Sequence, residues 1–233
     1  MKAIVGLCLG LWAGMSGAAL AQDSSATVVE LYTSQGCSSC PPADEILAGL
    51  AGREDVIALA LHVDYWDYLG WKDDFARAGH SARQKAYARV AGARTVYTPQ
   101  MVVGGLDRLV GARPDELGEA IARQAAVGPT VGLTLTRQGN EVRIGLDPKG
   151  QAAGKAEVHL VRYRPEAEVA IRRGENGGRT ITYHNIVTDW AVVADWNGRE
   201  AATVTAPAPG DAPVVVIVQA PGPGAILAAA RLR

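Results

Sequence analysis

Apolar residues in the first half of the chain form short continuous runs that alternate with patterns of helical spacing. The runs at 27–32 and 55–64 are almost uninterrupted, which is typical of strands covered on both faces. Proline suits the first turn of a helix, because it lacks the N–H that this turn leaves unpaired. The pattern predicts the order β-α-β-α-β-β-α, made of strand 27–32, helix 41–50, strand 55–64, helix 75–90, strand 98–105, strand 106–110 and a helix from Pro114.

The pattern changes near Gly128 and Pro129, beyond which nearly every segment is typical of strand or turn. Alternation of apolar and polar residues is clear at 158–164 and 180–183, and Gly, Pro and Asn separate the runs. Such spacing predicts an antiparallel all-β, sandwich-like domain at 129–233, after a first domain at 22–128. The expected strands are 132–136, 141–146, 156–164, 168–173, 180–188 and 214–219, with a loop at 206–213 and a hairpin turn at Asn197-Gly198.

The N-terminus is typical of a secretory signal peptide at 1–21. Lys2 precedes an apolar run at 3–12, and small residues end at Ala21. The run is too short for a transmembrane anchor, so no membrane insertion is expected after cleavage. The predicted location of the mature protein is therefore the periplasm or the outside of the cell.

Charge excludes one class of partner. Cleavage after Ala21 removes Lys2 and no acid, so 23 basic and 24 acidic residues become 22 and 24, a net charge of −2. Without a basic stripe to meet phosphates, no nucleic-acid partner is expected. Cleavage also removes Cys8, and the two remaining cysteines fit one disulfide in an oxidising compartment.

Those two cysteines, Cys37 and Cys40, form a Cys-x-x-Cys pair between a β-branched run and the helix that begins with prolines. Backbone N–H groups and the dipole at a helix start favour a thiolate on the first sulfur. The second cysteine lies one turn further, within reach of a mixed disulfide on the first. A dithiol at this position can be oxidised, reduced or metallated.

The element order, the dithiol and the Thr98-Pro99 pair before the third strand resemble the thioredoxin superfamily. The chain resembles more closely a poorly characterised family of secreted bacterial thioredoxin-like proteins that carries a domain-of-unknown-function label. The motifs that support this resemblance are ELYTSQGCSSCPPAD at 30–44, HVDYWDYLGW at 62–71, YTPQ at 97–100 and RGEN at 173–176. It implies an α/β thioredoxin-like domain at 22–128, not a substrate. Gly36, where thioredoxins have Trp, is a departure from the superfamily.

The resemblance implies a thiol–disulfide oxidoreductase or redox-linked protein. Cys37 attacks or accepts, Cys40 resolves, and Thr98 and Pro99 hold the substrate backbone. The expected substrates are proteins or small thiols and disulfides, with a membrane or periplasmic redox partner and no cofactor beyond the disulfide. Cys37, Cys40 and Pro99 are expected to share one partly exposed patch, with the Thr98–Pro99 bond cis.

The segment Asp64-Tyr65-Trp66-Asp67-Tyr68 leaves the second strand at the sheet edge that carries the dithiol. One interpretation is that Trp66 or Tyr65 walls the cysteine pocket while Asp64 or Asp67 handles protons for Cys40. The alternative is a packed loop whose acids cap the following helix.

Two further functions remain open. The same two thiolates could bind Cu(I), with His62 approaching as a third ligand, because soft metals prefer sulfur. The other histidines are too scattered to suggest a zinc site: His80, His159 and His184. Alternatively, the disulfide is structural and the β-rich half is a binding module using loops at 173–179 and 190–198. The segment 172–179 is interpreted as a solvated hairpin tip.

Overall fold

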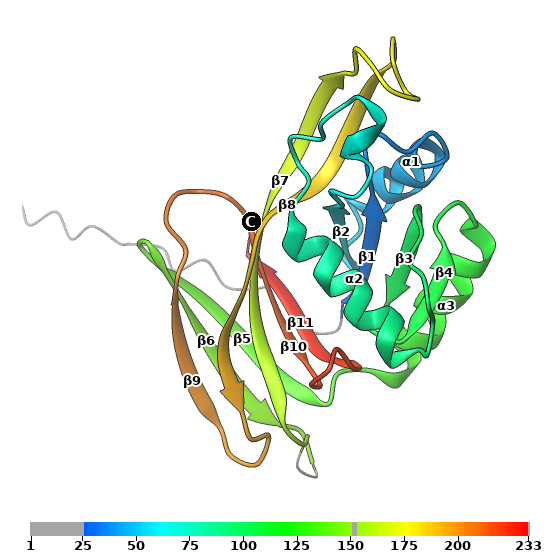
Figure 1. Cartoon of the computed structure of the whole chain (residues 1–233). Helices are drawn as coiled ribbons and strands as arrows, with labels where there is room; N and C mark the ends of the chain where they lie inside the picture. The colour runs from blue at the N-terminus through cyan, green and yellow to red at the C-terminus, as the bar shows by residue number, and fades with distance from the viewer. Residues whose placement is uncertain (1–25, 151–152, 233) are drawn as a thin grey trace, which may run out of the picture.

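A computed structural model describes residues 26–150 and 153–232 (Figure 1), so the predicted signal peptide lies outside the described residues. The order of elements in the first half is the predicted one. A short 3₁₀ helix, η1, is added between β2 and α2. The elements are β1 (Thr27–Thr33), α1 (Pro41–Leu50), β2 (Val56–His62), η1 (Asp67–Leu69), α2 (Ala78–Val90), β3 (Gln100–Val103), β4 (Asp107–Val110) and α3 (Pro114–Val127).

The second half is built of strands: β5 (Val131–Gln138), β6 (Glu141–Pro148), β7 (Ala156–Ala170), β8 (Thr180–Trp196), β9 (Ala202–Pro207), β10 (Val214–Gln219) and β11 (Ile226–Leu232). The runs predicted at 156–164 and 168–173 belong largely to one long strand, β7, and the predicted loop at 206–213 overlaps the end of β9. The turn at 197–198 does not join a hairpin, because β9 pairs with β6.

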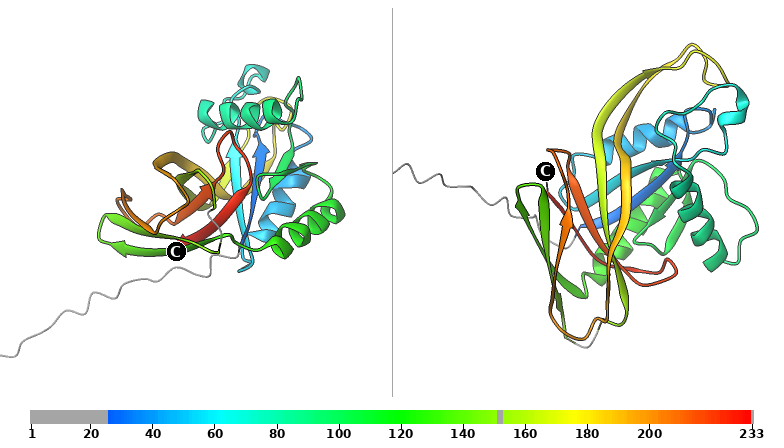
Figure 2. Two further views of the ribbon diagram at one scale, coloured as in Figure 1. Left: turned by 90° about the horizontal axis from the view of Figure 1, so that it is seen from below. Right: turned by 60° about the vertical axis from the view of Figure 1, so that its left-hand side comes forward.

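The fold is mixed α/β with one large sheet, in the order β11-β10-β7-β8-β2-β1-β3-β4. β1 runs parallel to β2 and antiparallel to β3. Helices α1 and α3 pack on one face of this sheet and α2 on the other (Figure 2). The first face buries Leu31 with Leu47 of α1 and Leu117 of α3, and the second buries Tyr32 with Tyr87 of α2.

The second half does not form a separate sandwich. Four of its strands extend the sheet of the first half, and β5-β6-β9 form a small second sheet that packs on them. The join lies between β2 and β8, where Ala60 pairs with Ile186 and the side-chain amide of Asn185 donates to the Ala58 carbonyl at 2.9 Å. β2 is buried throughout, so its backbone groups need such partners. Sheet-on-sheet packing, the predicted feature, persists between the small sheet and strands β7, β10 and β11.

Strands β7 and β8 form a long antiparallel ribbon whose pairing runs from Ala156–Trp196 to Ala170–Thr180. Beyond the join with β2, the ribbon rises past the sheet, and its tip arrives near the start of α1 (Figure 1). We call residues 163–186 the arm and residues 171–179 the arm tip. Within residues 26–150 and 153–232, no helix combines the length and apolarity needed to cross a membrane.

Candidate functional site

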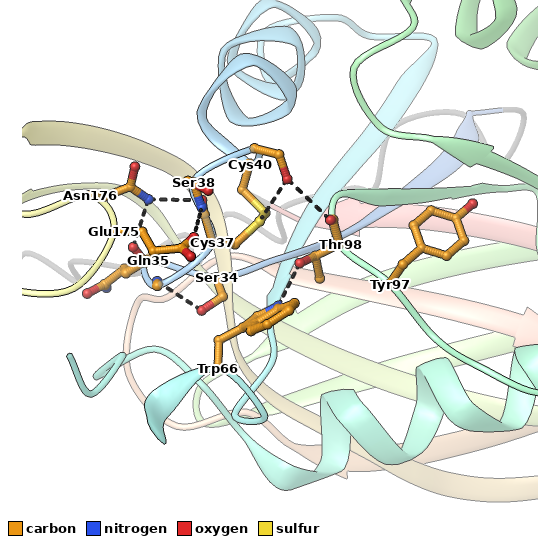
Figure 3. The surroundings of a disulfide bond; sticks show 12 residues. Ser34, Gln35, Cys37, Ser38, Cys40, Trp66, Tyr97, Thr98, Glu175 and Asn176 are labelled. Atoms are coloured by element: carbon orange, nitrogen blue, oxygen red, sulfur yellow. Dashed lines mark hydrogen bonds between the residues drawn. A yellow bond between two sulfur atoms is a disulfide. The ribbon is translucent and has the colours of Figure 1, made fainter. Parts of the chain in front are cut away.

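The Cys-x-x-Cys segment lies between the end of β1 and the first turn of α1 (Figure 3). Cys37 and Cys40 form a disulfide, with their Cα atoms 5.4 Å apart. The Cys37 N–H donates to the Ser34 carbonyl at 3.1 Å, and the Cys40 N–H donates to the Cys37 carbonyl at 3.2 Å. Cys40 is the N-cap of α1, and Pro41 opens the helix. The pair therefore lies where the strand-to-helix pattern predicts it.

The exposure of the pair is smaller than expected. Cys37 is 4% exposed and Cys40 is completely buried, whereas Ser38 and Ser39 between them are exposed. The tight turn draws both sulfurs under the loop. Both cysteines are therefore buried, and the predicted partly exposed patch is wrong for the sulfur pair.

Thr98 and Pro99 converge on the disulfide, and the bond between them is cis, as predicted. The Ser39 hydroxyl donates to the Thr98 carbonyl at 3.5 Å. A Cβ atom on Gly111 would lie 3.0 Å from Pro99 and 3.1 Å from Ala43 of α1, so this proline is close to the helix that follows the cysteines. The four residues expected to form the site thus lie at one end of the sheet.

Trp66 walls the cysteine loop, whereas Tyr65 points toward α2. The Trp66 indole N–H donates to the Thr98 hydroxyl at 2.8 Å, and a Cβ on Gly36 would be 3.4 Å from the Trp66 Cβ. The Tyr65 hydroxyl donates to the Gln84 side chain at 3.0 Å. A glycine before Cys37 therefore leaves room for Trp66 to pack closely on the loop.

The two acids of this segment make local contacts. The Ser81 hydroxyl of α2 donates to Asp64 Oδ1 at 2.5 Å. Asp67 Oδ1 accepts the Asp73 N–H at 3.1 Å, and burial raises the Asp67 pKa above its ordinary value. These contacts agree with a packed loop, but the predicted capping of the following helix is wrong: α2 begins at Ala78, its N-cap is Arg77, and no side chain caps it.

An acid close to Cys40 that sequence reasoning missed is Asp44. It lies one helical turn after Cys40, to whose carbonyl its N–H donates at 3.1 Å, and it is 5% exposed. Burial raises its pKa to about 7, although His62 and the Thr33 hydroxyl lower it. An acid on the apolar face of α1, between core residues Ala43 and Leu47, was the available signal.

His62 is paired behind this acid. Its Nδ1 lies 2.7 Å from Asp73 Oδ2, and both side chains are completely buried. The same Asp73 oxygen accepts the Gln35 N–H at 2.8 Å. Burial opposes ionisation of Asp73, but His62 and the backbone donors outweigh it and lower the Asp73 pKa. His62, the third ligand considered for Cu(I), is thus held by Asp73.

The arm tip covers the cysteine loop, and the interpretation of 172–179 as a solvated turn is wrong at Asn176. This side chain is 2% exposed, and its amide donates to the carbonyls of Gln35 at 3.0 Å and Cys37 at 2.9 Å (Figure 3). The Ser38 N–H donates to Glu175 Oε2 at 3.2 Å. Composition suggests a polar turn but does not reveal which polar groups find partners.

A cleft of about 570 Å³ lies elsewhere, between α2 and the faces of β7 and β8. Arg83 forms one wall. Its guanidinium binds the buried Glu30 carboxylate at 2.7 and 2.9 Å and stacks on the Trp190 ring, 4.0 Å from its centre. His159 is 4% exposed, and its Nδ1 accepts the Trp190 indole N–H at 3.1 Å.

In the described part of the chain, no cluster of three or more His, Cys, Asp or Glu side chains could hold a metal ion. Fold and site together define a mixed α/β protein with a Cys-x-x-Cys disulfide at a helix start, enclosed by an arm from the second half. The chain belongs to the family described as Protein of unknown function (DUF1223), whose model matches residues 28–219. The prediction of a family known by a domain of unknown function is confirmed at that level.

Two solved structures are similar. Protein AGR_C_4864 from Agrobacterium tumefaciens is 35% identical, with a TM-score of 0.77 over 91% of this chain and 95% of that chain. HBP35 of Porphyromonas gingivalis shares the fold at 14% identity, with a TM-score of 0.65 over 90% of this chain and 75% of that chain. No curated protein matches.

Proposed function

We propose that the protein is a thioredoxin-like thiol–disulfide oxidoreductase that works in the periplasm or outside the cell. The observation that carries the proposal is the Cys37–Cys40 disulfide at the start of α1 beside the Thr98–Pro99 segment. The order β1-α1-β2-α2-β3-β4-α3 supports the thioredoxin-like assignment. The exported location follows from the predicted signal peptide at 1–21.

In the reducing direction, the Cys37 thiolate attacks one sulfur of a substrate disulfide and releases the other as a thiolate, which takes a proton from water. Cys40 then loses its proton and attacks Cys37, forming the protein disulfide and releasing the second substrate thiolate. Two electrons pass from the protein to the substrate. The oxidising direction is the reverse.

We assign Asp44 as the group that accepts the proton of the Cys40 thiol when Cys40 attacks Cys37. This carboxyl lies one turn away in α1, on the same helix face. Its pKa of about 7 lets it accept a proton and return it near neutral pH. A thiol or dithiol partner, at the membrane or in the periplasm, must reset the pair after each turnover.

The test is disulfide exchange with a protein substrate such as insulin. The measured quantity is the loss of the insulin disulfides over time. Cys37→Ser should abolish exchange, and Cys40→Ser should accumulate a mixed disulfide on Cys37. An exposed hydroxyl residue outside the cysteine loop, Thr205 on β9, gives the matched control Thr205→Ala. If the wild-type protein leaves insulin intact under reducing conditions, it is not a reductase. If it also fails to oxidise a reduced peptide, the proposal is rejected.

A second candidate, ligand binding by the β-rich half, is favoured by the cleft between α2 and β8. Burial lowers the His159 pKa to about 4, so its ring is neutral, and with Nδ1 accepting from Trp190 its proton lies on Nε2. That buried N–H lies 3.5 Å from Glu157 and has no well-formed hydrogen bond. Saturable binding of the aromatic sulfonate 8-anilinonaphthalene-1-sulfonate, lost in Val192→Glu but not in Val110→Glu, would support this candidate.

A further inference from the structure

We propose that Glu175 and Asn176, at the arm tip, are positioning residues that favour the oxidised form of the Cys37–Cys40 pair. The inference rests on the proposed function and deepens it, because it concerns regulation of the same disulfide. It makes the arm a redox-sensitive clamp.

The arm tip is preorganised for this contact. Its loop is closed by backbone hydrogen bonds from Ile171 N–H to the Arg179 carbonyl at 2.9 Å and from Gly178 N–H to the Ile171 carbonyl at 2.8 Å. The Asn176 Oδ1 accepts from the Arg179 guanidinium at 3.2 Å. Because the Oδ1 is taken by a donor, the amide nitrogen must face the two carbonyls of the cysteine loop, which fixes its orientation.

Asn176 holds the loop through both of its amide hydrogens. One goes to the Gln35 carbonyl and the other to the Cys37 carbonyl, on either side of Gly36. Buried hydrogen bonds of this kind are costly to leave unmade. A change in the loop at Cys37 is therefore felt at the arm tip, 139 residues away in sequence.

Glu175 places a negative charge beside the residue that follows Cys37. Its carboxylate accepts the Ser38 N–H, and hydrogen bonds from the Ser38 hydroxyl and N–H lower the Glu175 pKa, so the group is charged at neutral pH. Reduction of the disulfide creates a second negative charge on Cys37, which is adjacent to Ser38. Two anions beside one N–H repel each other, which disfavours the thiolate and hence the reduced state.

The body of the arm is fixed by contacts that do not involve the cysteine loop. Ala60 of β2 pairs with Ile186, Asn185 donates to the Ala58 carbonyl, and the buried Tyr183 ring packs edge-on against His62. Between α1 and the arm lies a cavity of about 300 Å³, bordered by Asp44 and Thr180 among others. Coupling between two sites is reciprocal, so a tip that favours the disulfide must itself bind less tightly when the pair is reduced.

The first test is the equilibrium with glutathione. Two glutathione thiols give up two electrons and two protons and become the oxidised disulfide, while Cys37 and Cys40 take up both and become thiols. Glu175→Gln keeps an oxygen acceptor but removes the charge, and it should shift the equilibrium constant at least threefold toward the dithiol, about 14 mV for this two-electron couple. Asn176→Ala should shift it in the same direction. Glu168→Gln, an exposed acid on the same arm, is the control and should match the wild type.

The second test is backbone hydrogen exchange at residues 174–178 in the full chain. Exchange should be faster after reduction by a water-soluble phosphine than in the disulfide form. Equal exchange in the two states, or a Glu175→Gln equilibrium constant within 1.5-fold of wild type, overturns the clamp. Both measurements use small reagents alone, so they judge the clamp separately from the ability to exchange disulfides with proteins.

Discussion

The indole N–H of Trp66 donates to the hydroxyl of Thr98 across 2.8 Å, and so ties the loop after β2 to the segment that enters β3. Both partners lie beside the disulfide, one against Gly36 and the other against Ser39. The relationship explains why an aromatic residue with a polar edge is needed here, since Phe could pack but could not donate.

Trp66→Phe should therefore lower kcat/KM for disulfide exchange severalfold while reducing the free energy of unfolding by only about 1 kcal/mol, the typical net value of one hydrogen bond. Thr98→Val should have a similar effect. If the Trp66–Thr98 hydrogen bond causes the effect, kcat/KM of the double variant should be no lower than that of the less active single variant. Fully additive losses in kcat/KM would show that the two side chains act separately.

Asp44→Asn should stabilise the protein above neutral pH and weaken its activity. The folded-state pKa of Asp44, about 7, is above the ordinary 3.8, so the folded state holds a proton that the unfolded state has lost between those values. Unfolding free energy of the wild type therefore falls as pH rises from about 4 to 7 and then levels off. Three pKa units correspond to about 4 kcal/mol as an upper bound.

The measurement is urea unfolding of oxidised wild type and Asp44→Asn at several pH values. The advantage of the variant should grow from pH 4 to 7 and stay constant above. Asp74→Asn, at an exposed acid of the loop before α2, should give a flat difference. A constant difference for Asp44→Asn as well would contradict a raised pKa.

Arg83→Leu should destabilise the fold strongly, because it leaves the Glu30 carboxylate buried without its partner. Breaking one side of a buried ion pair typically costs about 3–5 kcal/mol. Here burial would raise the Glu30 pKa, and Arg83 and the Tyr87 and Tyr32 hydroxyls hold it low. Glu30→Leu together with Arg83→Leu should recover much of the loss in chemical denaturation. A double variant as unstable as the single one would mean that packing, not charge, sets the effect.

A fragment that ends at residue 128 should not fold by itself. The core beneath α2 is completed by Val161, Val187 and Ile217 from the second half, and β2 pairs with β8. Circular dichroism and proteolysis of residues 22–128 should show an unstable chain that gains protection when residues 129–233 are supplied. A stable, protease-resistant fragment would instead support two independent domains.

Local patterns predicted most of the first half, because each signal there spans few residues. Pro41 after Cys40 marks the start of α1, and the unbroken apolar run of β2 marks a doubly covered strand. The dithiol and Thr98-Pro99 were found for the same reason. The prediction of a separate sandwich was wrong because the sequence pattern of β8 indicates a strand but does not indicate the strand with which it pairs.

The arm tip and Asp44 were missed for a different reason. A turn such as RGENGG has the composition of a solvated loop, and only the fold shows that Asn176 meets two carbonyls. The pKa of Asp44 depends on burial, which raises it, and on His62 and Thr33, which come from other strands and lower it. Interactions between segments that are distant in the sequence do not produce a periodic pattern from which they could be predicted.

The placement of Asn176 on the Cys37 carbonyl also sets an order of events during synthesis. The cysteine loop is made 139 residues before the Asn176 that binds it, so at about 5–20 residues per second it exists for several seconds without this partner. The newborn chain thus presents its two thiols uncovered for a period. Whatever oxidises them first meets a site that the finished molecule no longer displays.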